Sequence, residues 1–531
     1  MQAGFARMND LTVIQASQGL AEYIVSSWPS RSTPSVVIGH DHRHNSRRFA
    51  RLAAAAMIQR GIKVYYYTAL VHTPLVPFGV SMLQASAGIM ITASHNPAQD
   101  NGYKVYWCNG CQIIPPHDKN IAAAIERNLE PKCWDENLVD NAPEGMVETP
   151  LNAVKDAYFT CLKNMNAESM AQRLRFVYTP MHGVGLSAML RATEDLGVDQ
   201  DMLVVPAQAQ PNPEFPTVRF PNPEERGALD LAISVATANG LTLVLASDPD
   251  ADRFAAAQRL PCGEWRTFTG NELGILFAAQ ALDAYRQKHP DIDKLNRLCM
   301  LCSTVSSQML RSMADAESFR FEETLTGFKW LGSRALQLRI EQGFDAVYAF
   351  EEAIGYMFVP VVYDKDGIAA ASVFITMARE WAQQGLTPYD KLQELYKKYG
   401  YFQSANSYFI SKDPALTRKV FADIRALGSP YPQSLGGRKI TRWRDLTEGY
   451  DSATPDNKPT LPVSKSSEMI TVEMEGGVRF TVRGSGTEPK IKMYIECKAD
   501  TEETAREGAE QVAADLTREW FRPAETGLLL P

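Results

Sequence analysis

The chain has 531 residues, a length at which one hydrophobic core no longer suffices, so we expect several domains. Hydrophobic residues make up 45% and charged residues 22% of the chain, which fits a globular protein and excludes the disordered, fibrous and coiled-coil classes. The formal net charge of −8 argues against nucleic acid as a partner, and no apolar run is long enough to cross a membrane, so we expect a cytoplasmic protein that binds neither.

The first part of the chain alternates β-rich runs with helical patterns. Residues 36–39 and 64–67 predict strands, and residues 46–60 predict an amphipathic helix between them. Such alternation is typical of an α/β sheet, whose strand ends hold ligands. We place a first α/β domain at residues 1–165.

A candidate nucleophile follows the apolar run 88–91. The motif Thr-Ala-Ser-His-Asn-Pro at 92–97 puts Ser94 in a loop at a strand end, with His95 beside it. A free serine hydroxyl needs a base, whereas a serine stored as its phosphate needs only a metal and an acceptor. The motif is not Gly-x-Ser-x-Gly, which argues against an α/β-hydrolase triad. A purely structural loop is the alternative.

The eight cysteines include two CxxC pairs, which raise the question of zinc or a redox pair. Cys299 and Cys302 lie in an apolar run, where a strand would turn them to opposite faces. Cys108 and Cys111 flank Asn-Gly, the pattern of a hairpin turn. Neither pair therefore favours a metal site.

Three carboxylates follow the strand predicted at 241–245, within a second α/β domain at residues 166–268. Asp248, Asp250 and Asp252 occupy alternate positions, so they repel one another unless they share a cation. Oxygen ligands without histidine or thiol favour Mg²⁺, and a phosphoryl oxygen on Ser94 could be a further ligand. The alternative is a solvated acidic turn.

Strands predicted at 298–301 and 346–350 belong to a third α/β domain at residues 269–398. Glu351 follows the second of these strands, where a carboxylate can accept hydrogen bonds from sugar hydroxyls. Thr326, Gly327 and Lys365 lie in similar polar loops, which could equally be plain surface.

The last domain, residues 399–531, has a different pattern. Residues 428–467 are rich in Pro, Gly, Ser and Asp and predict a long irregular connection. A hairpin around Gly476-Gly477, a strand at 490–497 and a helix at 501–521 then predict an α+β domain. Its motif Arg-Gly-Ser-Gly-Thr-Glu-Pro at 483–489 combines a guanidinium, hydroxyls and glycines, which predicts a cradle for phosphate.

Together, these motifs resemble the α-D-phosphohexomutase superfamily in wording and order over nearly the whole chain. Asp-Pro-Asp-Ala-Asp-Arg at 248–253 and Phe-Glu-Glu-Ala-Ile-Gly at 350–355 resemble its phosphopentomutase/phosphoglucomutase-2 branch. The resemblance implies three phosphoglucomutase-like α/β domains and a smaller α+β C-terminal domain around a central cleft.

The resemblance also implies residue roles. Ser94 would carry a phosphate with His95 beside it, Lys104 would be a general acid/base, and Ser94 with the three aspartates would bind Mg²⁺. The implied substrate contacts are Arg43, Ser46, Arg253, Thr326, Gly327, Glu351, Lys365, Arg483, Ser485, Gly486 and Thr487.

The implied activity is that of a phosphosugar mutase with a sugar bisphosphate as intermediate and activator. It would interconvert ribose or deoxyribose 1-phosphate and 5-phosphate, or glucose 1-phosphate and 6-phosphate. Hexose-selective members carry Glu-x-Ser where this chain has Glu351-Glu352-Ala353, which favours a pentose.

Two alternatives to a mutase stay open. One is a sugar bisphosphate synthase that uses 1,3-bisphosphoglycerate. The other is an inactive sugar-phosphate-binding paralogue, because the family's Gly-Thr-x-Gly-Leu-Arg stretch before Gly4 is absent from this sequence; a truncated gene model is the other explanation of that absence. We expect a monomer whose partners are small phosphosugars.

Overall fold

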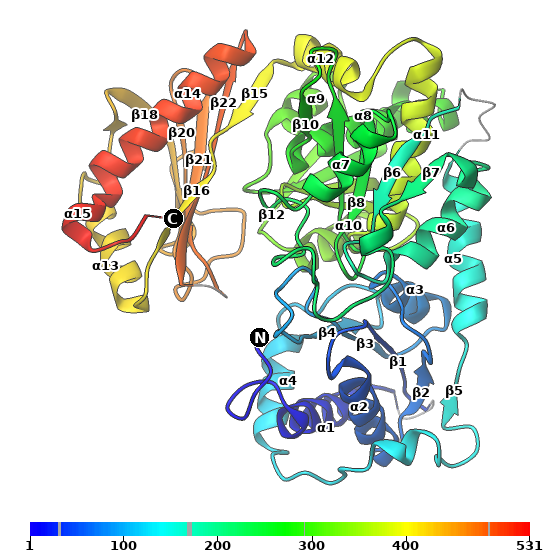
Figure 1. Ribbon diagram of the computed structural model, residues 1–531. Coiled ribbons are helices and arrows are strands. Elements are labelled where there is room, and N and C mark those ends of the chain that lie inside the picture. The colour runs from blue at the N-terminus through cyan, green and yellow to red at the C-terminus, as the bar shows by residue number, and fades with distance from the viewer. Residues whose placement is uncertain (30–32, 167–172, 291, 487–488, 531) are drawn as a thin grey trace. The chain divides into compact units, whose positions relative to one another are not determined.

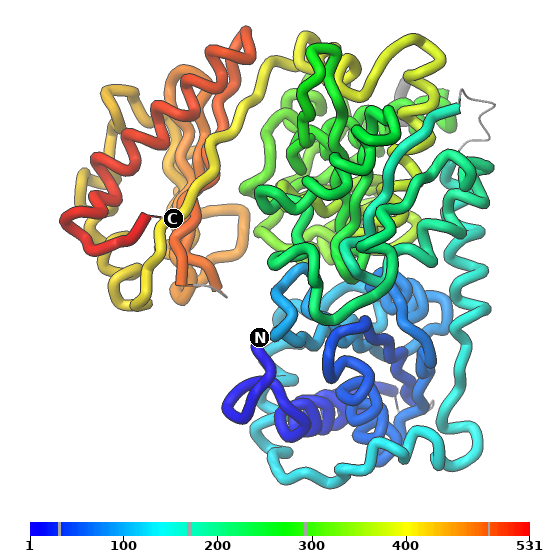
Figure 2. Tube along the Cα trace, in the orientation of Figure 1, coloured from blue at the N-terminus to red at the C-terminus, as the bar shows by residue number. Residues whose placement is uncertain are grey.

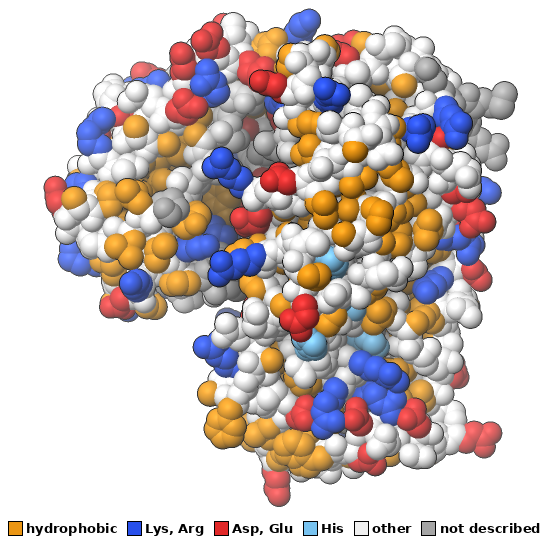
Figure 3. Space-filling model, viewed as in Figure 1, with side chains coloured by type: hydrophobic (Ala, Val, Ile, Leu, Met, Phe, Trp, Pro, Cys, Tyr) orange, Lys and Arg blue, Asp and Glu red, His pale blue; other side chains and the backbone are white. Residues whose placement is uncertain are grey.

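The computed structural model describes residues 1–29, 33–166, 173–290, 292–486 and 489–530 (Figures 1 and 2). The chain forms two compact units, Met1–Leu301 with Gly327–Lys391, and Cys302–Thr326 with Leu392–Pro531. Acidic and basic side chains are interspersed on the visible face of each unit (Figure 3). Within the described residues, no helix has both the length and the apolar character needed to cross a membrane. The domain boundaries given above stay predictions.

The first sheet has the strand order β4-β3-β1-β2-β5. Strands β1, β2, β3 and β5 run parallel and β4 antiparallel, so the βαβ alternation predicted here is confirmed. Every residue of β1 and β3 is buried, which explains their continuous apolar runs. The strands are β1 (Ser35–His40), β2 (Lys63–Tyr66), β3 (Ala87–Ile91), β4 (Tyr103–Trp107) and β5 (Val147–Glu148). The helices are α1 (Asp10–Ser27), α2 (Ser46–Gln59), α3 (Leu75–Met82), α4 (His117–Glu126) and α5 (Leu151–Met165).

The second sheet has the order β10-β9-β8-β6-β7. Strand β6 pairs in parallel with β7 and β8, while β8, β9 and β10 are antiparallel neighbours. The turn from β8 to β9 carries the three aspartates. The strands are β6 (Phe176–Thr179), β7 (Met202–Val204), β8 (Leu243–Ser247), β9 (Phe254–Arg259) and β10 (Trp265–Thr267), with helices α6 (Gly185–Asp195) and α7 (Asp230–Ala238).

The third sheet has the order β12-β11-β13-β14. Its strands are β11 (Leu298–Ser303), β12 (Arg320–Thr324), β13 (Asp345–Glu351) and β14 (Gly355–Phe358). The helices of this part of the chain are α8 (Gly270–Lys288), α9 (Met309–Glu317), α10 (Phe328–Gln342), α11 (Gly367–Gln383) and α12 (Pro388–Tyr399).

The C-terminal sheet follows the path β15-β22-β21-β20-β18-β17, with β16 paired to β22 and β19 to β18. The predicted hairpin is confirmed, because β20 and β21 pair across Gly476 and Gly477, which both have positive φ. Its strands are β15 (Tyr401–Ser404), β16 (Ser407–Ile410), β17 (Ser434–Leu435), β18 (Arg438–Asp445), β19 (Tyr450–Asp451), β20 (Met469–Met474), β21 (Val478–Gly484) and β22 (Lys490–Ala499). Its helices are α13 (Pro414–Arg425), α14 (Glu502–Asp515) and α15 (Pro523–Thr526). Short helical turns η1–η5 lie at Glu136–Val139, Asp199–Asp201, Pro206–Gln208, Ile292–Arg297 and Leu516–Phe521.

The prediction that residues 428–467 form only an irregular connection is wrong. Strands β17, β18 and β19 lie within that range, and Trp443 of β18 is 2% exposed in the core of this sheet. The register of β18 against β20 shifts between Ile440 and Arg442. This irregularity breaks the alternation of apolar and polar residues by which a strand is recognised in a sequence.

Candidate active site and metal centre

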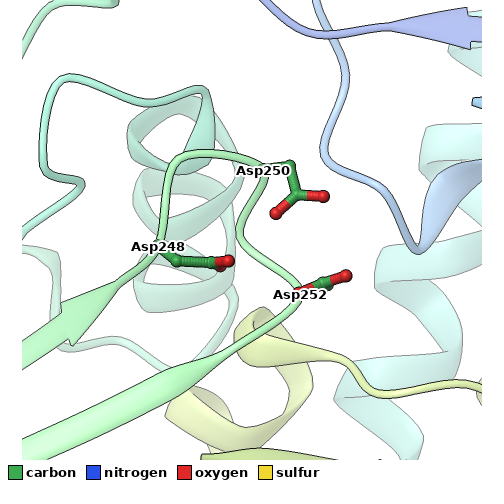
Figure 4. A group of neighbouring side chains, drawn as sticks. All are labelled: Asp248, Asp250 and Asp252. Atoms are coloured by element: carbon green, nitrogen blue, oxygen red, sulfur yellow. The ribbon is translucent and has the colours of Figure 1, made fainter. Parts of the chain in front are cut away.

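The turn of residues 248–253, here called the metal loop, buries three carboxylates. Asp248, Asp250 and Asp252, the aspartate trio, are each 0% exposed, and one oxygen from each lies within 4.8 Å of the others. Figure 4 shows the three side chains gathered at this loop. Strand β8 is buried along its whole length, so its end delivers these residues into the protein interior.

Three cations lie around the trio. Lys104 Nζ is 2.8 Å from the Oδ2 atoms of both Asp250 and Asp252, and Lys365 Nζ is 2.9 Å from Asp252 Oδ2. Arg253 Nε is 3.9 Å from Asp248 Oδ2 and from Asp252 Oδ1. Burial alone would lower the pKa of Lys104, but the two carboxylates raise it above its ordinary value.

The remaining oxygens of the trio fit a metal ion. Asp250 Oδ1 and Asp252 Oδ1 are buried and have no hydrogen-bond partner. Burial and then the two neighbouring carboxylates raise the pKa of Asp248 well above its ordinary value. Buried carboxylate oxygens without partners are costly, and a hard divalent cation with oxygen ligands would satisfy them. Of all described His, Cys, Asp and Glu residues, only these three group with metal-ligand spacing.

Ser94 lies against this cluster. Its Oγ donates to Asp248 Oδ2 at 3.0 Å, although the two residues are 154 positions apart. The backbone at Ser94 has φ 52°, and its N–H donates to Thr92 Oγ1 at 3.0 Å. A positive φ at a non-glycine residue is costly, and such residues cluster at active sites. The structure therefore brings the candidate nucleophile to the candidate metal ligands.

Arg43 and Ser46, for which the resemblance implied substrate contacts, are both buried. The Arg43 guanidinium is buried and donates to the carbonyl oxygens of Ser94 at 2.7 Å and Pro97 at 2.8 Å. Ser46 is 0% exposed, and its Oγ donates to Asp41 Oδ1 at 2.6 Å. Arg43 therefore supports the backbone of the Ser94 loop, and Ser46 holds the carboxylate of Asp41.

His95, next to the candidate nucleophile, is neutral. Burial, and then the charge of Arg253, lower the pKa of its imidazole to about 3. Its Nδ1 is buried without a hydrogen-bond partner. At neutral pH such a ring is a weak proton acceptor.

Glu351 lies at the end of β13, as predicted, and its carboxylate accepts a hydrogen bond from the Gly327 N–H. Burial, and then the charge of Glu352, raise its pKa to about 7. A carboxyl group with that pKa can either accept or donate a hydrogen bond near neutral pH.

The predicted phosphate cradle lies at the end of β21 in the second compact unit. Arg483 donates to the Thr326 hydroxyl, and the Ser485 N–H donates to the Lys490 carbonyl at 2.8 Å. Gly486 is exposed, with open space where a Cβ would stand. Thr487 lies outside the described residues.

No sequence motif marks Thr73, and only a weak one marks Asp364. The Thr73 hydroxyl donates to Asp250 Oδ2 at 2.6 Å from a loop 177 residues earlier. Asp364 lies 3.6 Å from Lys365 Nζ and accepts a hydrogen bond from Gln112 at 2.7 Å. Asp364 directly precedes Lys365 in a polar loop, and this position is the sequence feature that indicates a place in the site.

Comparison with family models finds four successive matches. They are described as phosphoglucomutase/phosphomannomutase alpha/beta/alpha domains I, II and III, at residues 1–132, 156–260 and 269–399, and C-terminal domain, at residues 447–514.

Three related proteins are similar to this chain over almost their whole length. Phosphoribomutase of Saccharomyces cerevisiae is 46% identical over 100% of this chain and 89% of its own length. Phosphopentomutase of Homo sapiens is 46% identical over 99% of this chain and 89% of its own. Glucose 1,6-bisphosphate synthase of Homo sapiens is 41% identical over 100% of this chain and 87% of its own.

Solved structures share the fold. A phosphoglucomutase/phosphomannomutase family protein from Burkholderia thailandensis matches with a TM-score of 0.69 at 16% identity, covering 100% of this chain and 97% of that one. Parafusin, a phosphoglucomutase from Paramecium, matches with a TM-score of 0.69 at 17% identity, covering 97% and 91%.

Proposed function

This chain belongs to the phosphoglucomutase/phosphomannomutase family, in its phosphopentomutase branch, and on that premise we propose that it is a phosphosugar mutase that works through phosphorylated Ser94. One observation carries the proposal. The Ser94 hydroxyl lies 3.0 Å from Asp248 Oδ2. Asp248 belongs to the aspartate trio, in which two other buried carboxylate oxygens have no hydrogen-bond partner.

The cation proposed for this site is Mg²⁺, held by the aspartate trio and by a phosphoryl oxygen on Ser94. When bound, it would neutralise negative charge on the phosphoryl group during transfer. The formal charges of the surrounding side chains support the combination of a divalent cation with a phosphate on Ser94. With all three carboxylates ionised around a bound cation, the trio would carry −3, while its partners Lys104, Lys365 and Arg253 carry +3. A divalent cation therefore leaves +2, which a phosphate dianion on Ser94 balances.

In the proposed cycle, a sugar hydroxyl attacks the phosphorus of phospho-Ser94, and the bond between phosphorus and Ser94 Oγ breaks. Lys104, whose Nζ lies beside the trio, would exchange the proton of the reacting hydroxyl. The resulting sugar bisphosphate reorients in the site without leaving the enzyme. It then returns its other phosphoryl group to Ser94. The same site would thus perform both half-reactions.

The other contacts are proposed to hold the sugar and its second phosphate. Glu351, with a pKa near 7 and the Gly327 N–H beside it, would bind sugar hydroxyls, and Lys365 would bind a phosphate oxygen. For the non-reacting phosphate we propose the cradle of Arg483, Thr326, Ser485, Gly486 and Thr487.

For the substrate, we propose ribose or deoxyribose phosphate ahead of glucose phosphate. Two relatives at 46% identity are named phosphoribomutase and phosphopentomutase. The chain also has Ala353 where hexose-selective members place a serine, so one hydroxyl contact is missing. A second candidate, a sugar bisphosphate synthase that uses 1,3-bisphosphoglycerate, is favoured by the 41% identity to a glucose 1,6-bisphosphate synthase.

The test compares wild type, Ser94→Ala and the control Ser81→Ala, whose hydroxyl bonds only to its own helix at Pro77. Each protein is incubated with ribose 1,5-bisphosphate and weighed by mass spectrometry. Each is then assayed with ribose 1-phosphate and glucose 1-phosphate, each with a trace of its bisphosphate.

We expect Ser94→Ala to remain unphosphorylated and to lose about 10³-fold or more in turnover, while Ser81→Ala behaves as wild type. Turnover retained by Ser94→Ala would reject the proposal. A wild type that binds sugar phosphate but stays unphosphorylated would indicate an inactive paralogue. Free bisphosphate released from 1,3-bisphosphoglycerate would indicate the synthase.

A further inference from the structure

Three successive carbonyl groups of the metal loop each accept a backbone hydrogen bond from a different part of the first compact unit. The Val184 N–H, just before α6, donates to Pro249 O at 2.8 Å. The Thr73 N–H, just before α3, donates to Asp250 O at 2.9 Å. The Gly367 N–H, at the start of α11, donates to Ala251 O at 3.2 Å. Donors associated with the first three sheets therefore converge on one loop.

The backbones approach too closely at this junction for ordinary side chains. A Cβ on Gly183 would lie 2.3 Å from the Cα of Pro249, and a Cβ on Gly367 would lie 2.3 Å from the carbonyl oxygen of Arg253. Ala251 itself has φ 50°. The loop therefore takes a tight conformation, supported by neighbours that are hydrogen bonded to its backbone on three sides.

Thr73 alone among the three donors also contacts a carboxylate of the trio. Its Oγ1 donates to Asp250 Oδ2 at 2.6 Å, and Thr73 is 1% exposed. Lys104 Nζ donates to the same Oδ2 at 2.8 Å, whereas Asp250 Oδ1 is buried without a partner. Because Oδ2 accepts two hydrogen bonds, the Asp250 carboxylate cannot rotate freely. Its Oδ1 therefore stays directed toward the other two carboxylates of the trio.

We infer that Thr73 is a positioning residue for the metal site: it fixes both the backbone and the carboxylate of Asp250, so that the loop presents Oδ1 to a divalent cation. This inference rests on the proposed metal role of the trio. Residues that hydrogen bond to metal ligands typically contribute about 10- to 100-fold to metal affinity. Thr73 supplies such a bond from the loop between β2 and α3, whereas the ligand follows β8 of the second sheet.

The test measures binding of Mn²⁺ to the full-length protein, with free Mn²⁺ followed by electron paramagnetic resonance. Thr73→Val and Thr73→Ala remove the hydroxyl, and Thr73→Ser restores it. The matched control is Thr193→Val, because Thr193 is buried and its hydroxyl bonds only within α6, to Met189 and Leu190.

We expect the dissociation constant for Mn²⁺ to rise about 10- to 100-fold in Thr73→Val and Thr73→Ala, and to remain near wild type in Thr73→Ser and Thr193→Val. Turnover of the two hydroxyl-free variants should recover at high Mg²⁺, since only the affinity has changed. The alanine variant carries the test if the valine variant does not fold.

The outcomes separate the inference from the function on which it rests. If wild type binds Mn²⁺ and both hydroxyl-free variants bind it equally well, Thr73 has no positioning role. If wild type itself binds no Mn²⁺, the metal part of the proposed function fails, and the inference fails with it.

Discussion

The aspartate trio is a set of buried like charges whose repulsion is offset by Lys104, Lys365 and Arg253. Lys104 contacts two of the three carboxylates, and its side chain is 18% exposed. A cation shared by two buried carboxylates has a larger effect than a surface ion pair, because removing it leaves buried charge without compensation. Without a metal ion, Lys104 therefore contributes strongly to the stability of the site.

We predict that Lys104→Met lowers the free energy of unfolding of the metal-free protein by about 3 kcal/mol. Mg²⁺ should then raise the melting temperature more in Lys104→Met than in wild type, because the cation replaces part of the missing charge. Thermal unfolding with and without Mg²⁺ measures both effects.

The control for this prediction is Lys63→Met. Lys63 pairs with the half-exposed Glu148 at 2.6 Å on the surface, so its loss should cost about 0–1 kcal/mol and leave the response to Mg²⁺ unchanged. An equal response to Mg²⁺ in Lys104→Met and wild type would contradict the prediction.

At the scale of elements, a buried pair ties α5 to the beginning of α11. The Tyr158 hydroxyl lies 3.0 and 2.9 Å from the two carboxylate oxygens of Asp366. Asp366 is the N-cap of α11 and accepts the N–H groups of Ile368 and Ala369. Burial raises the pKa of Asp366 to about 7. The first residue of α11, Gly367, donates a hydrogen bond to the metal loop. The contact between Tyr158 and Asp366 therefore also helps to position that loop.

We predict that Tyr158→Phe speeds amide hydrogen exchange in the first turn of α11, because the cap loses its partner. The matched control is Tyr285→Phe, which removes a bond of the same chemistry to Asp345, 2.8 Å away. Each change should cost about 1–3 kcal/mol of stability, but only the first should alter exchange near residues 367–370. If amide exchange near residues 367–370 is similar in the two variants, the hydrogen bonds of Tyr158 do not stabilise the first turn of α11.

At the scale of the whole molecule, the second compact unit includes a segment from much earlier in the chain, residues 302–326. Glu323 of β12 pairs with Arg444 Nη1 at 2.7 Å and with Arg479, and Arg444 is 2% exposed. Burial alone would raise the pKa of Glu323, but the two arginines hold it well below its ordinary value. The second compact unit therefore depends on residues 302–326 for a buried counter-charge.

We predict that Glu323→Gln lowers the free energy of unfolding by about 3–5 kcal/mol, because it leaves two arginines without their carboxylate. Adding Arg444→Met and Arg479→Met to the same protein should recover most of that loss. Glu322→Gln, next along β12 and paired with Arg320, should cost less than about 1 kcal/mol.

Urea unfolding followed by tryptophan fluorescence measures these changes, since Trp443 and Trp520 are buried in this unit. If the triple variant is no more stable than Glu323→Gln, the buried ion cluster is not the source of the loss.

Much of the fold and part of the site could be predicted because their signals are local. The α/β class follows from runs such as 36–39 and 88–91, and the hairpin of β20 and β21 follows from Gly476-Gly477. Strand β18 was missed because its register shift hides the alternation. No motif indicates that Arg43 donates to the Ser94 carbonyl or that Ser46 donates to Asp41.

By itself, the sequence determined which groups are available to bind and react: a serine after a buried strand, and three carboxylates at alternate positions after another. Only the tertiary structure decided that Ser94 contacts Asp248, that Thr73 contacts Asp250, and that Glu323 lies between two arginines. The reason is physical. Side-chain chemistry and strand periodicity are properties of neighbouring residues, whereas the direction of a carboxylate oxygen depends on donors that are 154 or 177 residues away.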